Sequence, residues 1–144
     1  MRLTCPQSWR DERGALVIEF GLIVPILFFI VFGIVDFGRA YFTMNNLAAA
    51  VREGARYGAV LQTPYQSPWP DSIVQRVEDF SYTFGGQSLQ ASQIAATTDT
   101  TAGTVTVTAN YTFRPITPLL NLVGLDSIPM RETAVFRWEF GGAN

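Results

Sequence analysis

The sequence contains no histidine, no lysine and a single cysteine, Cys5. Without histidine, the chain lacks the usual general base of enzymes and the commonest metal ligand. One cysteine cannot form a disulfide within the chain. The carboxylates are scattered, and no nucleophile motif such as Gly-x-Ser-x-Gly is present. We therefore predict that the protein is not an enzyme and needs no cofactor or metal.

Positive charge is also sparse. All ten basic residues are arginines, the formal net charge is −2, and the arginines form no cluster of the kind that phosphate binding requires. Nucleic acid is therefore not an expected partner. A length of 144 residues suits one compact domain better than two.

Charged residues are nearly absent from one segment close to the N-terminus. From Ala15 to Val35 the only charged residue is Glu19. A helix needs about 20 mostly apolar residues to cross the hydrocarbon core of a membrane, and at ~1.5 Å per residue this segment would span ~31 Å. We predict a membrane-spanning helix over 15–37, with a local bend at Pro25, because membrane helices tolerate proline.

The arginines around this helix predict its orientation. Three of them precede it: Arg2, Arg10 and Arg13. By the positive-inside rule the N-terminus is cytoplasmic and the rest of the chain extracytoplasmic, with Arg39, Tyr41 and Phe42 as an interfacial anchor on the far side. A cleavable secretory signal is the competing interpretation. Its apolar core would be shorter, about 7–15 residues, and a small-residue cleavage site would follow directly.

Glu19 is the exception within the apolar segment. An isolated carboxylate near lipid is costly, so a glutamate here is a candidate functional residue that needs a positive partner. If the chain is cut after Gly14, the new α-amino group of Ala15 can supply that charge, on the same subunit or a neighbour. Glycine before the cut would let a protease approach the backbone closely. The simpler alternative is an unprocessed anchor with Glu19 at headgroup depth.

The spacing of Gly14 and Glu19 resembles that of type IV prepilins, which a membrane-embedded prepilin peptidase cleaves after the glycine. The wider segment from Arg13 to Val60 resembles the TadE-like family, the pilin-like proteins (pseudopilins) of the bacterial tight-adherence pilus system. The residues that carry this resemblance are Arg13, Gly14, Ala15, Glu19, Phe20, Pro25, Asp36, Gly38, Arg39, Arg52, Glu53, Gly54, Arg56 and Tyr57.

This resemblance implies a minor pseudopilin of the bacterial inner membrane that helps to assemble a tight-adherence pilus for surface attachment. Its partners would be the prepilin peptidase, other pilins or pseudopilins, the inner-membrane assembly machinery and the lipid bilayer. Gly14 and Ala15 would form the processing site, and Glu19 would be the charge that sets subunit register. The alternative from another class is an unprocessed single-pass protein whose extracytoplasmic domain is a binding module.

Beyond the membrane, the helix is expected to continue to about Leu61, because no turn cluster interrupts it. Its apolar stripe is predicted at Ala40, Met44, Leu47, Val51, Ala55 and Gly58. Gly54 and Gly58 are interpreted as seats for the domain's own elements rather than as a subunit contact. Glu53 and Arg56 are interpreted as a solvated surface pair.

The rest of the chain predicts a second helix and then strands. Asp71 is the expected N-cap of the helix, which would end at Gly85-Gly86. Alternation of apolar and polar residues predicts strands at 94–98, 104–113 and 133–140. A two-turn helix is expected over 117–124, packed on the sheet, on a neighbouring subunit or on the membrane surface.

These elements predict a pilin-like α+β fold, in which the long N-terminal helix packs on a small antiparallel sheet accompanied by a second helix. The expected division is a cytoplasmic leader over 1–14, the long helix over 15–61 and an extracytoplasmic domain over 62–144.

Overall fold

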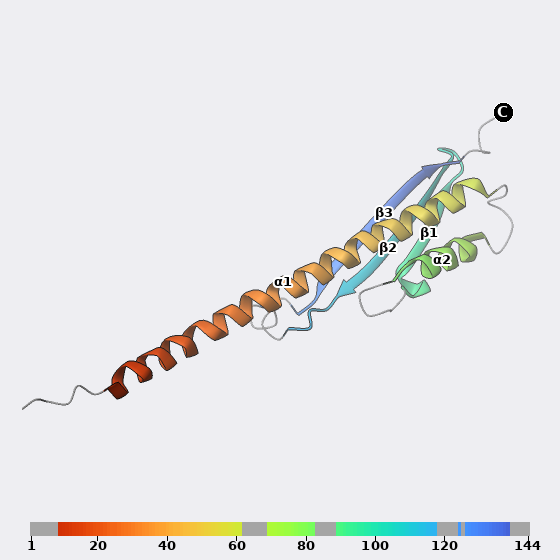
Figure 1. The fold of residues 1–144 in the computed structure, drawn as a ribbon. Helices are drawn as coiled ribbons and strands as arrows, with labels where there is room; N and C mark the ends of the chain where they lie inside the picture. The colour runs from red at the N-terminus through yellow and green to blue at the C-terminus, as the bar shows by residue number, and fades with distance from the viewer. Residues whose placement is uncertain (1–8, 62–68, 83–88, 118–123, 125, 139–144) are drawn as a thin grey trace, which may run out of the picture. The chain divides into compact units, whose positions relative to one another are not determined.

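A computed structural model describes residues 9–61, 69–82, 89–117, 124 and 126–138 of the chain (Figure 1). For residues 9–13 and Trp69 it describes the backbone alone. The contacts divide the chain into two units, Met1–Val35 and Asp36–Asn144. The element order is α1, α2, a short 3-10 helix η1, and strands β1, β2 and β3.

Helix α1 runs from Trp9 to Val60 and contains Pro25. It therefore begins inside the segment expected to be the leader and ends close to the expected Leu61. Up to Val35 the described side chains are exposed, except for Val24, which is partly buried. Among the described residues, α1 is the one helix long and apolar enough to cross a membrane, and none of its most apolar window is buried.

From Asp36 onward, α1 has one buried face. Its buried residues are Asp36, Thr43, Leu47, Ala50, Val51, Gly54, Ala55, Gly58 and Ala59. The predicted stripe was right at Leu47, Val51, Ala55 and Gly58, but it was wrong at Met44, which is 48% exposed. The buried face is offset by one residue there, because Thr43 takes the inward position.

Helix α2 runs from Trp69 to Phe80. It buries Ile73 and Val77 completely, whereas Phe80 at its last position is 46% exposed. Asp71 lies in the first turn of α2, so its predicted role as N-cap was wrong. The helix ends before Ser81, whose N–H donates to the Val77 carbonyl oxygen at 2.8 Å. Gly85 and Gly86, the expected end, lie outside the described residues.

The three strands form one antiparallel sheet in the order β1-β2-β3. β1 is Ile94–Asp99, β2 is Thr104–Phe113 and β3 is Ile128–Arg137. Asp99 closes the β1–β2 turn, because its carboxylate accepts hydrogen bonds from the N–H groups of Thr101 and Ala102 at 2.9 and 3.0 Å. Gly103 completes that turn with a φ of 63°, which glycine adopts without strain.

The antiparallel sheet and its first two strands were predicted correctly. The last strand begins earlier than expected, since it includes Pro129, and it ends before Trp138. Proline is tolerated there because β3 is an edge strand, where one row of N–H groups has no ladder partner to donate to. The helix expected over 117–124 falls mostly on residues 118–123, outside the described residues.

Both α1 and α2 pack on the same face of the sheet (Figure 1). The buried core residues are Leu47, Ala50, Val51, Ala55, Ile73, Val77, Leu89, Ile94, Val105, Val107, Ala109 and Ala134. The other face of the sheet carries threonines, such as Thr108 and Thr133, whose hydroxyls lie 3.0 Å apart across β2 and β3. The fold is thus the pilin-like α+β arrangement that the sequence predicted.

Candidate functional site

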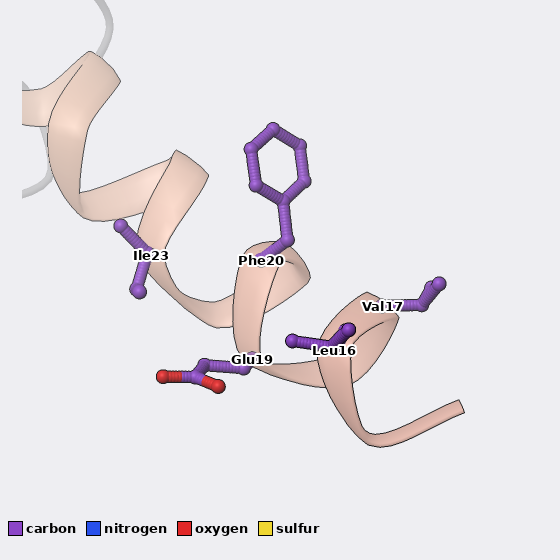
Figure 2. A pocket seen from close by; sticks show the side chains of 5 residues that line it. All are labelled: Leu16, Val17, Glu19, Phe20 and Ile23. Atoms are coloured by element: carbon purple, nitrogen blue, oxygen red, sulfur yellow. The ribbon is translucent and has the colours of Figure 1, made fainter. Parts of the chain in front are cut away.

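Glu19 lies on the exposed surface of α1 near its N-terminal end. Together with Leu16, Val17, Phe20 and Ile23 it lines a shallow, open hollow (Figure 2). Figure 2 shows the Glu19 carboxylate projecting outward beside the Ile23 side chain. Within the described part of the chain, no basic group lies within ion-pair distance of Glu19. A partner of opposite charge would therefore have to come from another molecule or from outside the described side chains.

Gly14 and Ala15 lie one turn before Glu19 and are exposed. A Cβ added at Gly14 would meet no other atom within 4 Å. The peptide bond between these residues is part of α1, so a protease would have to unwind this turn to reach it. Arg13 also lies in α1, although its side chain is not described.

Asp36 stands at the start of the second unit and is only 2% exposed. It accepts hydrogen bonds from the backbone N–H groups of Ile116 and Thr117 at 3.2 and 3.1 Å, and a short one from the Thr117 hydroxyl. Arg39, one turn further along α1, forms an ion pair with the same carboxylate at 3.1 Å. We name this group of Asp36, Arg39, Ile116 and Thr117 the Asp36 clamp.

Arg39 is therefore engaged within the protein. Its side chain is 13% exposed, and its guanidinium lies over the ring of Phe113, 5.2 Å from the centroid. Arg39 was predicted to be part of an interfacial anchor, but its side chain faces the domain instead of the surface. Phe42 contacts Tyr82, with ring centroids 6.0 Å apart, whereas Tyr41 is 64% exposed.

Glu53 joins the two helices. Its carboxylate accepts two hydrogen bonds from Arg56, both at 3.0 Å, as the predicted pair requires. It also accepts one from Arg76 on α2 at 3.0 Å, a contact that sequence reasoning missed because nothing in the sequence aligns the two helices. The Arg56 and Arg76 hydrogen bonds lower the pKa of Glu53, and Glu53 raises the pKa of Arg56. Arg76 also lies over the Tyr57 ring, 5.6 Å from its centroid.

Gly54 and Gly58 let α2 approach α1 closely. A Cβ at Gly54 would stand 2.3 Å from Val77 Cγ2, and one at Gly58 would stand 2.6 Å from Ile73 Cδ1. Real Cβ atoms do not make contacts this short, so any other residue at either position requires Val77 or Ile73 of α2 to shift. The interpretation of both glycines as seats for the domain's own elements is confirmed.

The remaining residues of the motif make no comparable contacts in the described structure. Phe20 is 69% exposed, Arg52 is exposed, and a Cβ at Gly38 would meet nothing within 4 Å. The described residues include no group of three or more histidine, cysteine or acidic side chains that could hold a metal. Several motif residues thus belong to two groups, the Asp36 clamp and the group of Glu53, Arg56 and Tyr57 that contacts Arg76 of α2, whereas Glu19 lies in the first unit and belongs to neither group.

Comparison with known families assigns this helix. Residues 14–56 match the family model described as TadE-like protein. The chain is TadE-like over this segment. The match begins at Gly14 and includes Glu19, Asp36 and Glu53, so it covers both the apolar half of α1 and the half that packs on the sheet.

The TadE-like resemblance seen in the sequence is therefore confirmed. TadE-like proteins are structural components associated with pili and are not an enzyme family. The strands and α2 lie beyond the matched residues. No curated protein and no solved structure matched the chain.

Proposed function

We propose that this TadE-like chain is a minor pseudopilin that a prepilin peptidase cleaves between Gly14 and Ala15. The mature protein is held in the bacterial inner membrane by the first half of α1, with its N-terminus cytoplasmic and the domain outside. It takes part there in assembly of a tight-adherence pilus used for surface attachment. Its partners are the peptidase, other pilins or pseudopilins, and the inner-membrane assembly machinery.

The observation that carries this proposal is the combination of a TadE-like segment starting at Gly14 with an exposed apolar run of α1, residues 15–35, that contains one carboxylate. A soluble protein would cover such a helix, whereas lipid solvates it without any partner. Glu19 then stands where the new α-amino group of Ala15 on a neighbouring subunit can reach it. Charge pairs of this kind add little net stability, but they are effective in fixing register.

The mature N-terminus tests the processing step. Mass spectrometry of the protein purified from membranes of its own host should find Ala15 as the first residue. Gly14→Val should leave the precursor uncleaved, because the branched side chain keeps the protease from the backbone. Gly33→Val is the matched control, since a Cβ at Gly33 also meets nothing within 4 Å, and it should be processed normally.

The same measurement separates this function from its alternative. An unprocessed single-pass protein with an extracytoplasmic binding module would begin at Met1 in the membrane, whatever residue stands at position 14. Normal cleavage of the Gly14→Val variant would contradict the proposed processing site.

A further inference from the structure

The Asp36 clamp has a consequence for the surface next to it. Asp36 follows the last residue of the apolar run, Val35, and the clamp fixes Ile116 against this first turn of the domain. Ile116 is 72% exposed although it is a large aliphatic side chain. The backbone N–H of Ile116 is tied to Asp36 at 3.2 Å, so the side chain is held in place while it faces outward.

Two further large side chains are exposed near the start of the domain. Phe37 lies on the same turn of α1 as Asp36 and is 73% exposed. Tyr41 lies on the next turn and is 64% exposed. Three large apolar or aromatic side chains are thus exposed around the point where the apolar run of α1 ends. Such a group marks a contact surface on a soluble domain, and tyrosine beside apolar residues is typical of the membrane interface.

We propose that Ile116 is a second membrane contact of this protein. The domain contacts the outer lipid interface through Ile116, at the end of the apolar run where Phe37 and Tyr41 are also exposed, and the Asp36 clamp holds Ile116 at that depth. Lipid is the occupant that fits, because most side chains of α1 from Leu16 to Val35 are apolar and exposed, and Val35 directly precedes Asp36, whose carboxylate binds Ile116. The inference rests on the proposed membrane span of α1.

The clamp also explains why an ionised carboxylate is buried so close to lipid. A carboxylate removed from water is costly unless its oxygens are fully hydrogen-bonded. Here two backbone N–H groups, one hydroxyl and one guanidinium satisfy Asp36. In return, the carboxylate binds the backbone N–H groups on both sides of the Ile116 Cα, which fixes the direction of the Ile116 side chain. Asp36 is therefore a positioning residue for the contact.

The test places a fluorescent label at single cysteines in a Cys5→Ser background. The full chain is reconstituted at one copy per nanodisc of phosphatidylcholine and phosphatidylglycerol, which excludes neighbouring subunits. Labels at Ile116→Cys and Phe37→Cys should both be blue-shifted and quenched by lipids carrying a doxyl group just below the headgroup. A label at Thr100→Cys should be neither, because β2 separates that turn from Phe113 by on the order of 30 Å.

The outcomes separate the two proposals. If the Phe37 label is in water, the membrane span itself is wrong. If the Phe37 label is quenched and the Ile116 label is not, the span stands and the second contact is overturned. A label at Ile116 that is blue-shifted but not quenched by doxyl lipid would mean that protein covers it, and this also overturns the contact.

The positioning role of Asp36 is tested with Asp36→Asn and Thr117→Val, which keep the side-chain shape. Each should reduce quenching of the Ile116 label and leave quenching of the Phe37 label unchanged, because the span does not depend on the clamp. Unchanged quenching at Ile116 in both variants would show that Asp36 does not hold the contact. Folding of each variant is checked by circular dichroism of the same Phe37-labelled sample, because a variant that fails to fold would lose helical signal.

Discussion

At the scale of single residues, two of the carboxylates of α1, those of Asp36 and Glu19, have opposite surroundings. Asp36 is buried and fully hydrogen-bonded by its own domain. Glu19 is exposed on an apolar surface, with no ion pair to any described side chain. A substitution at Asp36 should therefore act on the fold of one molecule, and a substitution at Glu19 on the association of several.

Glu19→Ala should be inserted and cleaved normally, because removing a charge from an apolar segment favours insertion. The defect should appear at assembly, as fewer pili and reduced co-purification with other pilins. Glu19→Asp should be partly defective, since it keeps the charge but loses about one methylene of reach. The measurement is pilus yield relative to the amount of mature protein in the same cells. Equal yield per mature subunit in wild type and Glu19→Ala would remove the charge pair from the mechanism.

Gly54→Ala tests the seat of α2. Its Cβ would stand 2.3 Å from Val77 Cγ2, and valine is stiff at χ1, so α2 has to move. Overpacking of this kind costs about 1–3 kcal/mol, more than the gain of up to ~1 kcal/mol from replacing glycine in a helix. The Tm of the protein in detergent should therefore fall.

Gly38→Ala is the matched control for that experiment, because nothing lies within 4 Å of the added Cβ. It should keep or raise the Tm through helix propensity alone. A Gly54→Ala variant as stable as Gly38→Ala would mean that α2 adapts at no cost.

At the scale of elements, Glu53 links α1 to α2 through Arg76. Its pKa is lowered in the folded state, chiefly by the hydrogen bonds from Arg56 and Arg76. A lowered folded-state pKa means that the contribution to stability is complete above the ordinary glutamate value and is lost as the pH falls through the lowered one. Exposed pairs of this type contribute about 0.2–1 kcal/mol.

The resulting prediction compares wild type with Glu53→Gln by thermal unfolding across pH. Wild type should be more stable at neutral pH, and the difference should shrink as the pH is lowered below the ordinary value of 4.5. Added salt should reduce the difference at neutral pH as well, because it screens exposed charges. A difference that is independent of pH would attribute the effect of the substitution to packing.

The elements that the sequence predicted well are those with a strong local period. The alternation from Thr104 to Phe113 specified β2, and the long apolar run specified the first half of α1. Contacts between distant residues could not be predicted. Nothing local indicates that Asp36 binds Thr117 or that Arg76 reaches Glu53, because each pairing depends on how α1, α2 and the sheet pack. The exposure of Met44 could not be predicted for the same reason, because the packing of α1 on the sheet decides which residue of that turn faces inward.

At the scale of the whole molecule, the orientation across the membrane is a prediction from the arginines before α1. Thr100 lies in the exposed β1–β2 turn, so a cysteine there should stay accessible. In a Cys5→Ser background, Thr100→Cys should react with an impermeant thiol reagent once the outer membrane is permeabilised. Labelling that needs disruption of the inner membrane would reverse the proposed orientation. The Cys5→Ser protein without the new cysteine is the control for background labelling.

The Asp36 clamp also constrains the order in which the molecule is built. Asp36 and Thr117 are 81 positions apart in the chain, and contacts of such separation close late, because the entropy of a long loop has to be overcome first. If the domain is exported as proposed, β1 and β2 can pair as a local hairpin during export, but until residue 117 has crossed Asp36 has only Arg39 nearby and lacks the donors of Ile116 and Thr117. On the proposed orientation, the carboxylate would therefore remain hydrated at the membrane exit for most of translocation and become buried only when the polypeptide is nearly complete.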